Sequence, residues 1–492
     1  MKLTIDFYIW LVFGKNAMDY AVTVFDIGKT NKKLIVFDED LKPLFEDKTR
    51  IGEVVKNGIL CDDAERIVAW MKSSFHNVLK RYDVKALAVT THGATVTYLS
   101  GGRLGFPIVS YNHDIDEKIR RMFYEEFGDP FSLYSITGTP PWGRLLNVGV
   151  QIYWFKKSYP ERFAETDTML FFPQYLTYEL SGIKSCEVTS SGCHTYLFDL
   201  RKKWWSLVAE GLEVDQRFPE FTEVWRPIGE LSIDGSEIAV TPGIHDSNAS
   251  ILPYVARGRE FVFASTGTWC VFMNPYSGFN PRREHLEQNI LYYADPFSRP
   301  VKSLIFPGGY EHDHYVKLIE EKFGVSPLGI SPSLEVIEEI LKRRRDFITP
   351  GLVEKSGRFP YSKPRIIGDL FFKDPRYAYH VLNLSLAIQS YAAVESISEE
   401  KKLDVIVQGG FANNEIYLLI LSALLPDSKV LRSGFSETTG LGAALCAKCA
   451  LEGLKPEDIE VEIPVEEVPK SMIDQDKLSQ YVEEFMSVVT ST

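Results

Sequence analysis

Four short segments of the sequence combine carboxylate, hydroxyl or amide side chains with glycine, and each lies beside an expected β-strand. They are Asp26–Lys33, Gly243–Ala249, Ser265–Thr268 and Val407–Asn414. A carboxylate at a strand end can hold a hydrated Mg²⁺, while turn N–H groups and hydroxyl groups face phosphate oxygens. The combination predicts phosphate chemistry, although no Gly-x-x-x-x-Gly-Lys-Ser/Thr P-loop is present.

The first segment, Asp26-Ile-Gly-Lys-Thr-Asn31, has two interpretations. In the functional one, Asp26 holds Mg²⁺ while the turn N–H groups, Thr30 and Lys33 face phosphate oxygens. In the other, the segment is an ordinary hairpin turn with a surface aspartate. Within the turn, Lys29 either adds a phosphate contact or points to solvent.

The segment Ser265-Thr-Gly-Thr268 also lies between two expected strands and can present N–H and hydroxyl groups to phosphate. Such turns are common, so this one is weak by itself, whereas a pair with one in each half of the chain is far more informative. After a further expected strand, Gly409 and Gly410 would let the backbone approach a flat ligand closely.

The sharpest segment is Gly243-Ile-His-Asp-Ser-Asn-Ala249. Pro242 and Gly243 break the chain, and a helix is expected to follow, with His245 and Asp246 at its entrance. Asp246 could simply cap that helix. Alternatively, it is a general base that accepts a proton from a hydroxyl group as that group attacks a phosphoryl group.

The elements that position these segments occur in two similar series. Each begins with a strand–turn–strand unit, continues with helices and contains a further buried strand. The expected strands are 20–26, 32–37, 86–90, 261–265, 270–273 and 405–407, and the longer helices are about 62–81, 378–399 and 438–451. The pattern predicts a duplicated α/β fold, with lobes at 18–253 and 254–492 and a cleft between them. Residues 1–17 are interpreted as an extension ahead of a start at Met18.

Taken in order, the four segments resemble the FGGY carbohydrate kinases, whose duplicated ribonuclease-H-like core is shared with actin and hexokinase. Asp26–Lys33 is similar to the first phosphate motif of that family and Thr266–Thr268 to the second, while Gly409–Asn413 is similar to the adenosine motif. Gly243–Ser250 resembles the catalytic segment of the rhamnulokinase and fuculokinase branches.

The resemblance implies an ATP-dependent sugar kinase that uses Mg²⁺, with Asp246 as general base and Asp26 near the metal. It places the following residues around the nucleotide and its phosphates: Gly28, Lys29, Thr30, Asn31, Lys33, Thr266, Gly267, Thr268, Gly409, Gly410 and Asn413. The sugar contacts that it implies are His92, Gly93, His245 and Asp246.

The branch resemblance implies a 6-deoxy ketohexose as substrate, L-fuculose or L-rhamnulose, phosphorylated at O1. Other pentuloses and hexuloses stay open, because His92 stands where rhamnulokinases tend to have Trp, and Lys29 where the family usually has a small or hydroxyl residue. Two other classes also stay open. One is a non-catalytic, actin-like nucleotide switch, and the other is a sugar-sensing regulator derived from a kinase.

The composition limits the possible partners and the cellular location of the protein. The 492 residues carry a net charge of −13, which argues against nucleic acid as the main partner. No stretch approaches the roughly 20 apolar residues that span a membrane. Six scattered cysteines are too few for a disulfide framework, so a reducing cytoplasm is expected. A homodimer is the usual expectation for such an enzyme.

Three other features receive structural interpretations. Glu311-His-Asp-His314 has metal-binding residue types, but a solvated loop is expected there. Cys446 and Cys449 have redox or zinc spacing, yet they fall within a helix face of small residues. The stretches 274–283 and 455–469 are expected to be the least ordered.

Overall fold

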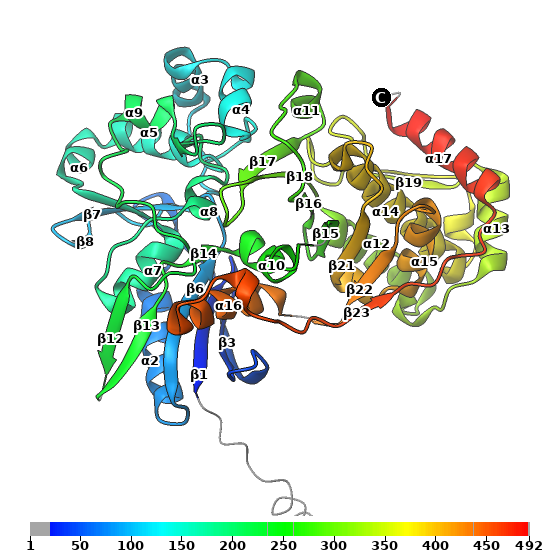
Figure 1. Cartoon of the computed structure of the whole chain (residues 1–492). Coiled ribbons are helices and arrows are strands. Elements are labelled where there is room, and N and C mark those ends of the chain that lie inside the picture. Colours follow the sequence, from blue (N-terminus) through cyan, green and yellow to red (C-terminus); the bar gives the residue numbers. More distant parts are fainter. Residues whose placement is uncertain (1–19, 234, 259, 436, 491–492) are drawn as a thin grey trace, which may run out of the picture.

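The computed structural model describes residues 20–490, except 234, 259 and 436 (Figure 1). The interpretation of residues 1–17 as an extension therefore lies outside the described residues. Two seven-stranded sheets of mixed direction, each with helices packed against it, form the two lobes. The expected α/β fold with two related lobes is confirmed.

The first sheet has the strand order β12-β13-β6-β1-β2-β3, and β14 extends along the same edge of β6. β1 and β2 form the expected hairpin, while β6 and β14 run parallel to the direction of β1. The strands are β1 (Ala21–Ile27), β2 (Asn31–Phe37), β3 (Pro43–Arg50), β6 (Val84–Thr91), β12 (Gly229–Ile233), β13 (Ser236–Val240) and β14 (Ile244–His245).

The second sheet has the order β17-β18-β16-β15-β21-β22-β23. β15 and β16 form the second expected hairpin, and β21 lies parallel to β15. The strands are β15 (Phe261–Thr266), β16 (Cys270–Asn274), β17 (Ile290–Ala294), β18 (Pro300–Phe306), β21 (Asp404–Gly409), β22 (Val430–Ser433) and β23 (Val465–Glu467). The two sheets thus repeat one arrangement, in which a hairpin lies beside a parallel strand.

The remaining elements cover the sheets or extend the first lobe. The helices of the first lobe are α2 (Ala64–Leu79), α3 (Glu117–Phe127), α4 (Pro130–Thr137), α5 (Val148–Ser158), α6 (Pro160–Glu165), α7 (Phe172–Ser181), α8 (Val188–Ser191), α9 (Leu207–Leu212) and α10 (Asp246–Val255). Those that follow are α11 (Arg283–Glu287), α12 (Gly308–Phe323), α13 (Leu334–Arg343), α14 (Pro375–Ser398), α15 (Glu415–Leu424), α16 (Thr438–Glu452) and α17 (Gln475–Thr490).

Short strands and 3₁₀ turns complete the chain. Small sheets are formed by β4 (Glu53–Lys56), β5 (Ile59–Asp62), β7 (Val96–Ser100), β8 (Arg103–Leu104), β9 (Thr168–Phe171), β10 (Phe198–Asp199), β11 (Trp204–Trp205), β19 (Phe347–Thr349) and β20 (Arg365–Ile367). The 3₁₀ turns are η1 (Pro327–Gly329), η2 (Leu370–Phe372), η3 (Gly410–Asn413) and η4 (Pro456–Asp458).

Helices α10 and α16 join the two lobes. Although α16 comes late in the chain, it packs on β1 and β6 of the first sheet and against α10 (Figure 1). The helices approach so closely that a Cβ on Gly442 would lie 1.8 Å from the carbonyl oxygen of Ala249. One apolar core contains residues of both sheets together with these helices. The two sheets are therefore joined by a shared apolar core.

One sequence prediction for this part of the chain is wrong. Glu311–His314 is not a solvated loop, because it lies in the first turns of α12. Glu311 is buried there and accepts hydrogen bonds from Gln389 Nε2 (2.9 Å) and Gly351 N (3.2 Å). In the stretch 455–469, the regular elements are η4 and β23, and β23 pairs with β22.

The expected helix at 438–451 is confirmed as α16. All six cysteines are buried and free of disulfide bonds, and Cys446 and Cys449 lie on α16 as expected. Within the described part of the chain, no three metal-ligating side chains form a cluster. Among the same residues, no helix is long and apolar enough to cross a membrane.

Candidate active site

The first-lobe candidates meet at one edge of the first sheet. Asp26 pairs with Thr90 across β1 and β6, and His245 pairs with Thr91 across β14 and β6. Because these three strands are parallel, their carboxyl ends carry Asp26, His92 and Asp246 to the same side of the sheet. Burial and, after it, the negative charge of Asp246 raise the pKa of Asp26. The topology thus brings segments more than 200 residues apart into one site.

Asp246 is the first residue of α10, and its side chain is 34% exposed. Ser247 donates its N–H (2.6 Å) and its hydroxyl (3.3 Å) to Oδ1, and His245 Nε2 lies 3.2 Å from the same oxygen. Among the described residues, these contacts all go to Oδ1, which leaves Oδ2 to accept a proton. Burial raises the pKa of Asp246, an effect that favours a base over a bare surface carboxylate. The sequence alternative of a simple N-cap does not apply, since the cap position is His245.

The sugar-side candidates His92 and Gly93 follow β6. His92 is buried against Phe172 and Tyr111, with ring centroids 5.2 and 5.3 Å away, and its Nδ1 lies 3.0 Å from the Gly93 carbonyl oxygen. A Cβ on Gly93 would lie 3.1 Å from His245 Nε2. The missing side chain at Gly93 therefore lets the loop after β6 lie directly on the His245 ring.

The first turn is held by two lysines that have different partners. Lys32 is 1% exposed, and its ammonium donates to the carbonyl oxygens of Gly28 and Lys29, both at 2.8 Å. Lys33 pairs with Glu437, just ahead of α16, at 2.7 Å. Burial, reinforced by the charge of Asp246, raises the pKa of Asp26 to about 7. Of the remaining turn candidates, Thr30 and Asn31 are exposed.

Lys29 neither points to solvent nor stands alone in the turn. Its Nζ donates to both carboxylate oxygens of Asp62 and to Ser110 Oγ, each at 2.9 Å, and lies 3.0 Å from Glu53 Oε1. It also lies 4.4 Å from the ring centroid of Tyr111. These partners border His92, whose Nε2 is 4.0 Å from Asp62. Lys29 therefore connects the first turn to the loop that carries the sugar-side candidates.

The second-lobe candidates also meet at a sheet edge, because Thr266 and Gly409 pair across β15 and β21. The Thr266 hydroxyl donates to the Gln408 carbonyl oxygen (2.6 Å) and accepts from Phe411 N (2.9 Å). Thr266 therefore fixes the Gly409–Gly410 turn through its side chain. Gly267, Thr268 and Asn413 are exposed and free to face a ligand.

Gly409 occupies a backbone conformation that suits only glycine, with φ 91° and ψ −151°. A Cβ there would lie 2.6 Å from the Thr266 carbonyl oxygen. We expect Gly409→Ala to lower the free energy of unfolding by about 1–3 kcal/mol and to raise the KM for ATP. Gly410→Ala is the matched control, since its Cβ would lie 3.4 Å from the same oxygen. Thermal unfolding and ATP saturation curves of both variants test this, and equal behaviour of the two would contradict it.

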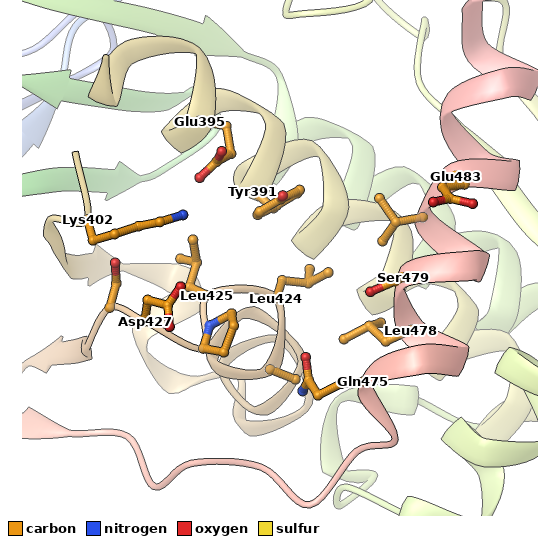
Figure 2. A pocket seen from close by; sticks show the side chains of 14 residues that line it. Tyr391, Glu395, Lys402, Leu424, Leu425, Asp427, Gln475, Leu478, Ser479 and Glu483 are labelled. Carbon is orange, nitrogen blue, oxygen red and sulfur yellow. The ribbon is translucent and has the colours of Figure 1, made fainter. Parts of the chain in front are cut away.

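Several residues of the site were not predicted from the sequence: Lys32, Glu53, Asp62, Ser110, Asn248 and Glu437. Most of them contact segments that are distant in the sequence, so no local sequence pattern predicts their part in the site. Asn248 is the exception, because it lies two residues after Asp246 in the sharpest motif. A separate cavity of about 330 Å³ lies among α14, α17 and the loop after α15, and none of the candidates lines it (Figure 2).

The fold and the paired turns define the class: an α/β protein of two actin-like lobes, each with a glycine turn within a hairpin. Two family profiles match the chain in succession. "FGGY family of carbohydrate kinases, N-terminal domain" matches residues 21–247, and "Carbohydrate kinase FGGY, C-terminal domain" matches residues 258–456. The chain belongs to the FGGY family of carbohydrate kinases.

Individual relatives are more distant. A rhamnulokinase from Enterococcus faecalis is 27% identical over 117 residues, which cover 22% of this chain and 24% of the relative. A rhamnulokinase from Lactiplantibacillus plantarum is 28% identical over 127 residues, 24% of this chain and 26% of the relative. The chain thus matches about a quarter of the length of these curated relatives. The crystal structure of a carbohydrate kinase from Novosphingobium aromaticivorans is 25% identical, with a TM-score of 0.79, and the match covers 96% of this chain and 99% of that one.

Proposed function

We propose that the protein transfers the γ-phosphoryl group of ATP to a terminal hydroxyl group of a ketose. The observation that carries this proposal is Asp246, a partly exposed carboxylate with a raised pKa and an open Oδ2, at the same sheet edge as Asp26. Phosphoryl transfer requires little more than positioning, charge stabilisation and one carboxylate that accepts the hydroxyl proton. Both lobes contribute the turns that such positioning needs.

In this mechanism Asp246 Oδ2 accepts the proton of the attacking hydroxyl group, while Ser247 donates hydrogen bonds to Oδ1 and His245 Nε2 lies beside it. Gly93 and His92 line the proposed sugar site. The exposed backbone of the second turn at Gly267 and Thr268 faces the transferred phosphoryl group, together with Lys33. The Gly409–Gly410 turn lies under the nucleotide. Each of these residues either orients a reactant or stabilises charge, and Asp246 alone moves a proton.

The residues present suit a magnesium ion bound with the nucleotide. Mg²⁺ is usually held by one or two carboxylates plus substrate phosphates, and Asp26 supplies such a carboxylate. Its pKa of about 7 leaves it readily ionised beside a cation. Bound Mg²⁺ supplies neutralisation of the phosphate charge. Glu437 keeps the ammonium group of Lys33 beside this carboxylate and, although burial opposes the charge, raises the pKa of Lys33.

The acceptor that we favour is a 6-deoxy ketohexose, L-rhamnulose or L-fuculose, phosphorylated at O1. Support comes from the His245-Asp246 pair and from the partial matches to two rhamnulokinases. The test is ADP release by the purified protein with MgATP, measured across a panel of 6-deoxy ketohexoses, pentuloses, hexuloses and polyols. We expect ADP release that depends on a ketose, fastest with a 6-deoxy ketohexose.

Two outcomes of the panel would overturn parts of the proposal. Faster turnover with another ketose would correct the substrate. ATP hydrolysis at the same rate with and without every sugar would contradict the kinase activity and would favour an actin-like nucleotide switch, which needs both phosphate turns but no base at Asp246.

A further inference from the structure

The imidazole ring of His245 is buried, and several residues contact it. The residue caps α10 and donates its backbone N–H to Thr189 Oγ1 at 3.0 Å. Gly93 lies against one edge of the ring, and Tyr293 meets it at 82° with centroids 6.2 Å apart. The side chain is 5% exposed, and this burial lowers the pKa of His245 to about 4. At neutral pH the imidazole is therefore uncharged and carries one N–H.

The two ring nitrogens have different partners. Nε2 lies 3.2 Å from Asp246 Oδ1, and Nδ1 lies 3.3 Å from Asn248 Nδ2. A carboxylate can only accept a hydrogen bond, whereas an amide nitrogen can only donate one. Because Nδ1 is the atom that accepts from Asn248, the single ring proton is on Nε2, where the nearest carboxylate oxygen is Asp246 Oδ1.

The opposite tautomer would fail at both ends. Its bare Nε2 would face the carboxylate, and its Nδ1–H would face the N–H₂ of Asn248. Rotating the Asn248 amide would repair only the second contact. Cys193 Sγ lies farther from Nε2, at 3.9 Å, and burial keeps its thiol protonated by raising its pKa. That weak contact does not compensate for a lone pair against Asp246.

We infer that Asn248 is a positioning residue whose amide N–H fixes the Nε2-protonated tautomer of His245, so that the Nε2–H faces Asp246 Oδ1 and Oδ2 stays open for the acceptor hydroxyl group. Asn248 is fully buried in the first turn of α10. Its Oδ1 is buried without a hydrogen-bond partner among the described residues. The amide is thus oriented with its N–H₂ toward the ring, although this leaves its oxygen without a partner. This is the orientation that the tautomer requires. The role of Oδ2 rests on the proposed function, whereas the tautomer does not.

The direct test is the ¹⁵N NMR spectrum of the full-length protein with labelled histidine at pH 7.5. The His245 signals are assigned by their loss in His245→Gln. We expect a pyridine-type Nδ1 and a pyrrole-type Nε2. A protonated Nδ1 in the wild-type protein, either alone or together with a protonated Nε2, would overturn the inference. This readout needs no turnover, so it stays interpretable even if no sugar on the panel is phosphorylated.

Variants test the role of Asn248 itself. Asn248→Ala should allow a population with Nδ1–H and lower kcat by up to about 100-fold, with little change in the KM for ATP. Asn248→Asp, whose carboxylate can only accept, should move the proton onto Nδ1. Ser398→Ala is the matched control, because this buried hydroxyl at the end of α14 donates to the Val394 carbonyl oxygen at 2.7 Å and lies outside the site. A wild-type tautomer and wild-type kcat in Asn248→Ala would contradict the inference.

Discussion

Asp246→Asn is expected to lower kcat by at least about 10²–10⁴-fold, with ATP binding nearly unchanged. The amide keeps the shape of the carboxylate, but its nitrogen or its neutral oxygen replaces the atom that accepts the hydroxyl proton. Ser247 can still donate to the remaining oxygen, beside which His245 Nε2 lies, so the local fold should persist. Steady-state ADP release with the best ketose, together with ATP affinity measured by calorimetry, separates the loss of proton transfer from a loss of binding.

The control for this variant is an aspartate of similar charge away from the site. Asp40→Asn serves, because the Asp40 side chain is 68% exposed. Its turnover should match that of the wild-type protein. If Asp246→Asn turned over within a few-fold of wild type, another group would have to accept the proton and the assignment of Asp246 would be wrong.

The strand-end motifs could be predicted from the sequence because each is local. Runs of β-branched and aromatic residues define β1 and β15, and the breaks at Gly28 and Gly267 end them, so each hairpin is encoded within about 15 residues. The meeting of Asp26 with Asp246 is not encoded locally. It follows from the parallel order of β1, β6 and β14, and the resemblance to a known family carried that part of the prediction.

The predictions that failed share one physical cause. Glu311–His314 has a polar composition and follows two glycines, which are poor helix formers, so the local pattern favours a loop. The fold supplies what the pattern lacks, because Gln389 on α14 satisfies the buried Glu311 carboxylate. The partners of Lys33 and Lys29 were missed for the same reason. Glu437 lies 404 residues from Lys33 along the chain.

Lys29→Met is expected to lower the free energy of unfolding by about 3–5 kcal/mol, because it strands a buried charge. The Asp62 side chain is 3% exposed, and Lys29 Nζ donates a hydrogen bond to each of its two carboxylate oxygens. Burial opposes the charge of Glu53 as well, yet hydrogen bonds from Ser110 and Lys29 hold the pKa of that carboxyl below its usual value. Without Lys29, two neighbouring carboxylates would have to be neutralised or exposed.

A double-mutant comparison separates the pair from the packing of the lysine chain. Lys29→Met combined with Asp62→Asn should recover much of the lost stability, since the second change removes the stranded charge. Lys42→Met is the matched control, because the Lys42–Asp40 pair is exposed at both ends and should change stability by at most about 1 kcal/mol. Denaturant unfolding of the four proteins measures these differences.

Because Asp62 borders His92, the sugar KM of Lys29→Met should rise as well, whereas its KM for ATP should change less. A loss no larger than that of Lys42→Met would mean that the Lys29 network does not stabilise the site.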